Sequence, residues 1–199
     1  MVINSRWTVP IPDGSLQKWI FGSSQGPLSD KPLLIDADRP DTHFLSKADY
    51  RLLSKRVALG LLDAGLKPGD RVLLFSGNNL YFPSVFLGIL MAGGIFTGAN
   101  PGFVSRELAY QLKDSGASFM IAATAGLKTA LEAAKEVGLS RDRVFVFDAP
   151  EVPKTERPSP GRAGREEGMR HWTELLQGNM ERARGWDWQE PTDQNTTIW

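Results

Sequence analysis

The 199-residue sequence contains no cysteine and two histidines, His43 and His171. The absence of cysteine excludes a disulfide scaffold, thiol chemistry, iron–sulfur clusters and thiolate zinc sites. The chain also has no excess of positive charge, because its 23 basic side chains balance 23 acidic ones. Binding to nucleic acid depends on a basic surplus, so we expect no nucleic-acid partner.

Long apolar segments are scarce as well. The first 20 residues carry charges and lack the apolar core of a targeting signal. Residues 80–99 are uncharged and reach the length of a membrane span, but Pro83 and four glycines interrupt them. We therefore expect one buried helix followed by one buried strand in this segment, and no membrane span.

Hydrophobic residues form 41% of the chain, enough for a folded core that buries roughly 70% of the unfolded surface. Four short apolar runs alternate with four helical patterns. The runs lie at residues 71–76, 94–97, 118–122 and 144–147, and the helical patterns at 46–65, 82–92, 105–115 and 125–137. The first run (RVLLFS) shows no polar alternation, which is typical of a parallel strand buried on both faces. The order predicts an α/β fold, with a mostly parallel sheet and helices on both faces.

We divide the chain into four parts. Residues 1–31 form an extended N-terminal arm with a short helical turn near residues 15–20, and residues 32–149 form the α/β core subdomain. The core begins with a hairpin, residues 32–36 and 42–45, around a turn of Asp and Pro residues. Residues 150–170 are rich in Pro, Gly and charges and predict a mobile loop. Residues 171–199 predict a short helix (171–176) and a polar tail, in which Trp186 and Trp188 serve as packing anchors.

The loop after the strand at 71–76 is the candidate ligand cleft. Open α/β sheets bind ligands at the carboxyl ends of their strands. This rule makes Gly77, Asn78 and Asn79 candidates, although every strand–helix loop of such a sheet shares the position. The glycine run at residues 92–102 has no lysine, and neither GxGxxG nor GxxxxGK followed by Ser or Thr occurs. We interpret the run as close helix–strand packing followed by a turn.

Two further constellations are weaker candidates. Three aspartates, Asp36, Asp38 and Asp41, lie near His43 and could bind a metal. Turns attract Asp because its carboxylate accepts backbone N–H bonds, so we interpret these residues as turn residues and expect no metal site. A Ser-His-Asp triad would need His43 or His171, and no GxSxG elbow accompanies either of them.

Three blocks of sequence together resemble the N-terminal part of the adenylate-forming superfamily. The blocks are residues 44–53 (FLSKADYRLL) with 67–72 (KPGDRV), residues 78–83 (NNLYFP) with 86–88 (FLG), and residues 90–94 (LMAGG) with 100–101 (NP), 106–112 (RELAYQL) and 114–117 (DSGA). Residues 171–176 (HWTELL) also fit. The chain is most similar to 4-coumarate–CoA ligase-like acyl- and aryl-CoA synthetases, especially fungal members.

The resemblance implies a two-step reaction. ATP and a small carboxylic acid form an acyl-adenylate and pyrophosphate with the help of Mg²⁺, and the thiol of coenzyme A then displaces AMP. The similarity covers roughly the first third of a family member. The Ser/Thr/Gly-rich phosphate loop, the acid pocket and the catalytic lysine would lie after Trp199. We therefore assign no catalytic or metal-binding residue, and ATP, Mg²⁺ and CoA are implied only for the full-length relative.

The sequence thus predicts the N-terminal portion of an acid–CoA ligase, inactive by itself, whose partner is the rest of the ligase. The apolar end at Ile198 and Trp199 favours this reading. The alternative is a natural truncated relative, either an interaction module that pairs with a partner chain or a protein recruited for non-ATP chemistry near residues 76–79. The expected compartment is intracellular, cytoplasmic or peroxisomal, and the acid substrate stays open.

Overall fold

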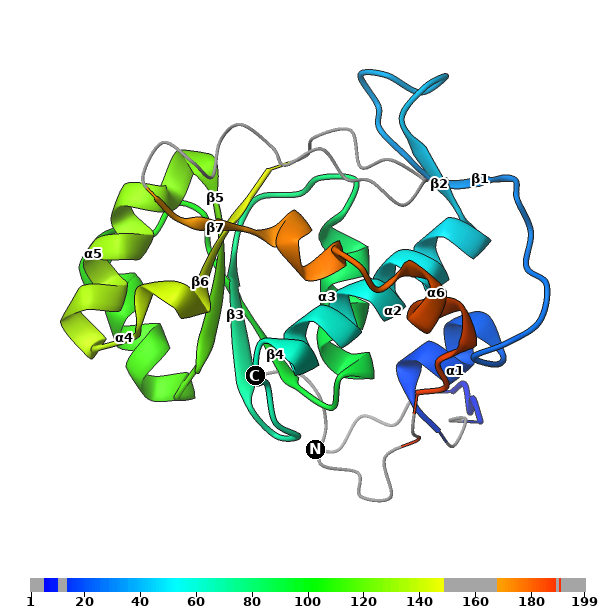
Figure 1. Cartoon of the computed structure of the whole chain (residues 1–199), viewed down its shortest axis with the longest axis horizontal. Coiled ribbons are helices and arrows are strands. Elements are labelled where there is room, and N and C mark those ends of the chain that lie inside the picture. Colours follow the sequence, from blue (N-terminus) through cyan, green and yellow to red (C-terminus); the bar gives the residue numbers. More distant parts are fainter. Residues whose placement is uncertain (1–5, 11–13, 149–167, 189, 191–199) are drawn as a thin grey trace.

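The computed structural model describes residues 6–10, 14–148, 168–188 and 190. The loop expected at residues 150–170 lies almost wholly outside the described residues, and so do residues 191–199 of the tail. The described part is built around one parallel sheet with helices on both of its faces (Figure 1).

Five strands form the central sheet in the order β4-β3-β5-β6-β7, and every neighbouring pair is parallel. They are β3 (Arg71–Phe75), β4 (Ile95–Ala99), β5 (Phe119–Ala123), β6 (Val144–Phe147) and β7 (Arg170–His171). Along β3, Val72 and Leu74 join one apolar cluster, whereas Leu73 and Phe75 join the cluster on the opposite face. Both faces of the strand are buried, which explains its lack of polar alternation. The predicted parallel α/β fold is confirmed.

The helices divide between the two faces of the sheet (Figure 1). On one face pack α2 (Lys47–Asp63) and α3 (Phe82–Met91), and on the other pack α4 (Ser105–Ser115) and α5 (Leu127–Val137). A capping box starts α2. The Asp49 N–H donates to Ser46 Oγ at 3.1 Å, and the Ser46 N–H donates to the Asp49 carboxylate at 3.0 Å.

Residues 80–99 contain α3 and β4, so the predicted buried helix and strand are confirmed. The glycine run between these elements allows close packing, because a Cβ on Gly94 would lie 3.1 Å from the carbonyl oxygen of Ile89. None of the helices in the described part of the chain combines the length and the apolar character that a membrane crossing requires.

A separate two-stranded sheet precedes α2. Strands β1 (Pro32–Ile35) and β2 (Phe44–Ser46) pair antiparallel, as the sequence predicts. The second strand begins two residues later than expected. The reason is the turn, in which the N–H groups of Thr42 and His43 donate to the carbonyl oxygen of Arg39 at 3.2 and 2.9 Å.

The segment after residue 168 differs from the prediction. Its first residues pair with β6 as β7, a strand that the sequence did not predict, whereas the short helix predicted at residues 171–176 is present as a 3-10 helix (η4, Trp172–Leu176). A further helix, α6 (Met180–Gly185), lies where we expected a polar tail. Met180 and Ala183 are its buried residues, and two apolar positions are too few to reveal a helical period.

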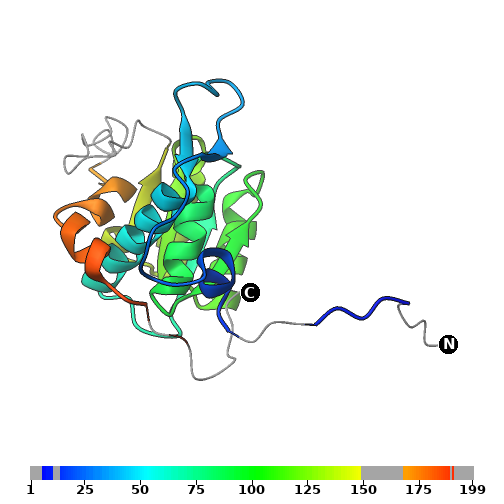
Figure 2. The same ribbon diagram turned by 90° about the vertical axis from the view of Figure 1, so that its right-hand side faces the viewer.

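The N-terminal arm contacts α2. The arm contains α1 (Leu16–Phe21). After α1, backbone carbonyl groups of the arm between residues 23 and 26 accept hydrogen bonds from two side chains of α2, Arg51 and Lys55. The ring of Trp188 lies 6.3 Å from that of Phe21 and is 7% exposed, which confirms it as a packing anchor. Trp186 is partly buried against the same cluster. Residues 6–10 extend away from the body (Figure 2).

Lys55 makes the stability of this contact depend on pH. The residue is 2% exposed, its Nζ donates to the Ser24 carbonyl at 2.8 Å, and burial together with the nearby Arg51 lowers its pKa to about 8. An unfolded lysine titrates near 10.4, so between those values the unfolded chain binds more protons and stability rises with pH. We expect the urea midpoint of the wild type to rise relative to Lys55→Met between pH 8 and pH 10. Parallel curves for the two proteins would contradict this expectation.

Candidate functional site

The loop between β3 and α3 lies at the carboxyl edge of the sheet. Gly77 and Asn78 are exposed, and Asn79 is half-buried. The Asn79 side-chain oxygen accepts the N–H groups of Tyr81 at 2.8 Å and Phe82 at 3.0 Å. Asn79 therefore orders the turn that leads into α3, whereas Asn78 is exposed and accessible to a ligand.

The variant Asn79→Ala tests the structural role of Asn79, and Asn78→Ala tests whether Asn78 has one. The Asn79 variant loses the two hydrogen bonds that order the turn before α3. A hydrogen bond of this kind contributes about 1 kcal/mol, so we expect a lower free energy of unfolding in urea. Asn78→Ala is the matched control, because the Asn78 side chain is exposed, and its unfolding midpoint should stay at the wild-type value. Equal midpoints for both variants would show that the Asn79 bonds contribute nothing.

The turn between β1 and β2 lies at the same edge. The Asp36 carboxylate accepts the N–H groups of Asp38 at 3.0 Å and Arg39 at 3.2 Å, and it pairs with the Arg39 guanidinium at 3.2 Å. Partial desolvation acts to raise the pKa of Asp36, but these hydrogen bonds and the Arg39 charge outweigh it and hold the pKa below its usual value. The interpretation of Asp36 as a turn residue is confirmed.

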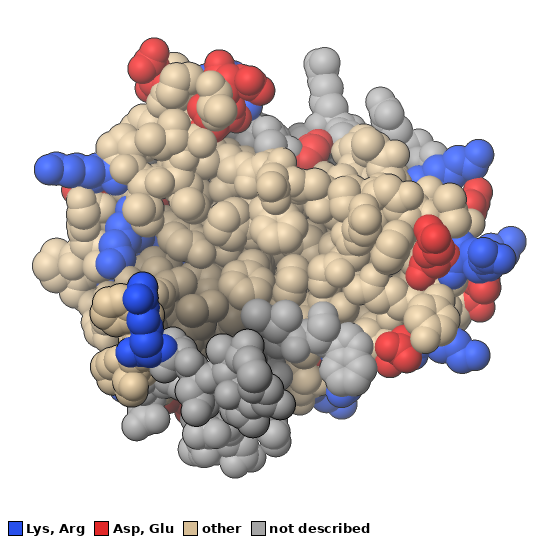
Figure 3. Space-filling view, turned by 180° about the vertical axis from the view of Figure 1, so that it is seen from behind, with Lys and Arg blue, Asp and Glu red and all other residues tan. Residues whose placement is uncertain are grey.

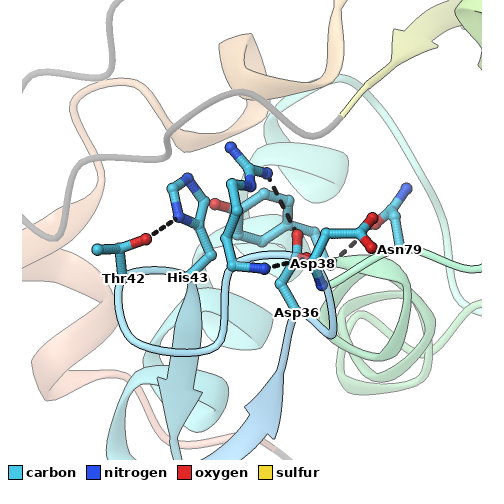
Figure 4. A network of polar contacts seen from close by, with 7 residues as sticks. Asp36, Asp38, Thr42, His43 and Asn79 are labelled. Carbon is cyan, nitrogen blue, oxygen red and sulfur yellow. Dashed lines mark hydrogen bonds and ion pairs between the residues drawn. The ribbon is translucent and has the colours of Figure 1, made fainter.

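The structure brings the two candidate clusters together. In Figure 4 the Asn79 side chain lies beside the hairpin turn that carries Asp36, Asp38 and His43. The Thr42 hydroxyl and His43 Nδ1 form a hydrogen bond of 2.8 Å in this turn (Figure 4). No group of three or more His, Cys, Asp or Glu side chains suited to a metal ion occurs in the part of the chain that the structure describes.

The second histidine belongs to a buried polar cluster. His171 Nε2 lies 2.8 Å from the Asp148 carboxylate, and His171 Nδ1 lies 2.7 Å from the Thr173 hydroxyl. The arrangement has the order of a catalytic triad, but Thr173 is 1% exposed and His171 is 3% exposed. No substrate reaches that hydroxyl, so the cluster holds β7 and η4 against β6. Asp148 and Thr173 were not among the predicted site residues, although an Asp directly after a buried strand was an available signal.

Comparison with known proteins gives the family. A family model described as AMP-binding enzyme matches residues 24–187. The chain belongs to the AMP-binding enzyme family. Among curated members, a phenylacetyl-CoA ligase of Aspergillus niger is 36% identical over 198 residues, and an acyl-CoA ligase of the same species is 34% identical over 201 residues. A 4-coumarate–CoA ligase of Arabidopsis thaliana is 37% identical over 94 residues, which is 47% of this chain and 16% of the plant enzyme.

The chain spans about a third of its AMP-binding relatives. Both Aspergillus niger alignments cover 100% of this chain, but they cover 34% and 35% of the relatives. Among solved structures, a luciferase-like enzyme from Zophobas morio superposes with a TM-score of 0.74 at 16% identity, covering 96% of this chain and 40% of that protein. A benzoate CoA ligase from Burkholderia xenovorans superposes with a TM-score of 0.60 at 22% identity, and the match covers 79% of this chain and 27% of that enzyme. These superpositions support the fold.

The β1–β2 turn at the carboxyl edge does not fit the phosphates of the nucleotide that the AMP-binding name implies. Phosphate sites use cationic side chains or converging backbone N–H groups. Here the Asp36 carboxylate occupies the N–H groups of the turn and also pairs with the Arg39 guanidinium. Asp38 adds a second carboxylate, which would repel a phosphate. We therefore derive no catalytic step through ATP or Mg²⁺ from these residues.

Proposed function

We propose that this chain is the N-terminal α/β subdomain of an ATP-dependent carboxylic acid–CoA ligase and is inactive by itself. The observation that carries the proposal is the coverage: the match spans the whole chain but only 34% of the phenylacetyl-CoA ligase. ATP, Mg²⁺, CoA and a small carboxylic acid then bind to an enzyme that the rest of the ligase completes. Because the reaction consumes ATP and CoA, we place it inside the cell, in the cytoplasm or the peroxisome.

The proposal gives each part of the chain a role. Residues 32–149 supply the core that supports the site, and residues 171–199 lead toward the phosphate loop. At the carboxyl edge, Gly77, Asn78 and Asn79 lie on the wall of the cleft that the remaining part would close. Open α/β sheets bind ligands at this edge, and the solvent-facing Asn78 amide supports its use there.

Acid-dependent ATP–pyrophosphate exchange tests the inactivity directly. The purified 199-residue chain should give no exchange above background with phenylacetate, benzoate or 4-coumarate, because it lacks the phosphate loop. The phenylacetyl-CoA ligase of Aspergillus niger is the positive control. Exchange by the isolated chain would overturn the proposal.

The intact mass of the gene product in its native source tests the fragment status. We expect a species about three times the 21.9 kDa of this chain, because the chain covers 34% of the phenylacetyl-CoA ligase. A native product of 21.9 kDa would favour the second candidate, a truncated relative that acts as an interaction module. An exposed aromatic face on α4, with Tyr110 at 71%, supports that candidate.

A further inference from the structure

Helix α4 carries an unusual combination of groups on its solvent face. Tyr110, in the middle of the helix, is 71% exposed, and Val104, just before its start, is 57% exposed. A groove of about 580 Å³ runs along this face, lined by Phe103, Arg106, Glu107, Tyr110, Gln111 and Asp114. Tyr110 lines this groove, and tyrosine is enriched among the residues that anchor protein interfaces.

The charges beside Tyr110 separate by sign. At 3.6 residues per turn, Arg106 and Lys113 fall on one flank of Tyr110, and Glu107 and Asp114 fall on the other. All four charged side chains are exposed. Acidic and basic side chains both lie at the right-hand edge of Figure 3, the side of the molecule that holds α4 and α5. The helix therefore presents an aromatic centre between a basic flank and an acidic flank.

These charges are largely unused within the chain. Among the described residues, Arg106, Lys113 and Asp114 form no ion pair within 4.0 Å. Glu107 accepts the backbone N–H of Val104 at 3.1 Å, which leaves its carboxylate able to accept further bonds. The flanks can thus pair with a second surface without first breaking contacts of their own.

We propose that α4 is the interface of a two-fold symmetric dimer of this chain, in which the two α4 helices pack side by side and parallel. The charge pattern selects this arrangement. A two-fold axis parallel to the helices brings each basic flank to the partner's acidic flank, whereas an antiparallel pair would bring like flanks together. Lys113 then meets the partner's Asp114, and Arg106 meets the partner's Glu107, each twice. The two Tyr110 rings pack along the groove between the flanks.

Exchanging the charges at positions 113 and 114 tests the pairing. In Lys113→Glu and in Asp114→Lys, both symmetric contacts become like-charged, so each variant alone should dimerise at least about tenfold more weakly than wild type. An equimolar mixture of the two variants restores opposite charges at both contacts. We expect sedimentation equilibrium to show recovery of the dimer, and native mass spectrometry to identify it as a heterodimer. The double exchange in one chain should also recover it.

Matched controls lie on the neighbouring helix α5. Lys128→Glu and Glu132→Lys introduce the same charge changes at exposed positions away from the groove, and both should dimerise as the wild type does. Tyr110→Ser should weaken the dimer without affecting the fold, as judged by circular dichroism. A wild-type chain that stays monomeric to about 500 µM would overturn the proposal, since even weak specific complexes associate there. So would a dimer that is indifferent to the exchanges, or a mixture that fails to recover.

Discussion

Gly60→Ala is expected to destabilise this chain strongly, although it adds only one methyl group. A Cβ on Gly60 would lie 2.1 Å from the carbonyl oxygen of Leu175 and 2.6 Å from its carbonyl carbon. Both partners are backbone, so no side chain can rotate to relieve the contact, and η4 must move away from α2. Overpacking of this kind costs about 3 kcal/mol at the upper end of its usual range. Urea denaturation should show a lower midpoint with an unchanged slope.

Gly185→Ala is the control for this change. The same methyl group added at Gly185 meets nothing within 4 Å. Alanine favours helical conformation over glycine, so the control should leave the midpoint unchanged or raise it slightly. If Gly60→Ala behaved like Gly185→Ala, the close approach of α2 and η4 would be wrong.

The second large effect is expected from Asn179→Ala, which breaks a buried polar link between α2 and the C-terminal segment. The Asn179 amide nitrogen donates to the carbonyl oxygens of Arg56 at 2.9 Å and Leu175 at 2.8 Å. Its oxygen accepts from Arg56 Nε at 3.3 Å, and the Arg56 guanidinium also donates to the Leu176 carbonyl. Arg56 is 3% exposed, and this burial lowers its pKa from the usual arginine value.

Removing Asn179 leaves the Leu175 carbonyl and Arg56 Nε without the partner that Asn179 supplies in the interior, while the Arg56 carbonyl keeps its hydrogen bond within α2. Unsatisfied buried groups cost about 1–3 kcal/mol each, so we expect a loss of about 3 kcal/mol in the free energy of unfolding. Hydrogen exchange should quicken in η4 and α6 before it does in the central strands. Asn78→Ala, at an exposed position, is the control for losing an asparagine side chain. A midpoint shift no larger than that of Asn78→Ala would contradict the role assigned to Asn179.

The candidate site could be predicted only in part. The loop of Gly77, Asn78 and Asn79 follows from a general rule about parallel sheets, so its place at the carboxyl edge was accessible from the sequence. The Asn79 side chain orders the turn before α3 while Asn78 is exposed, and this difference depends on side-chain geometry that residue types do not encode. The buried contact of His171 with Asp148 joins positions 23 residues apart through the pairing of β6 and β7.

The sequence by itself determined the fold class, the hairpin, the order of strands and helices as far as β6, and the family. Local rules suffice for these features, because burial on both faces leaves apolar runs and amphipathic helices leave a period. Only the tertiary structure showed that η4 and α6 pack against α2 through the hydrogen bonds of Arg56 and Asn179, two residues that are 123 positions apart in the chain. Contacts across such distances depend on how whole elements pack, and no local pattern in the chain records that.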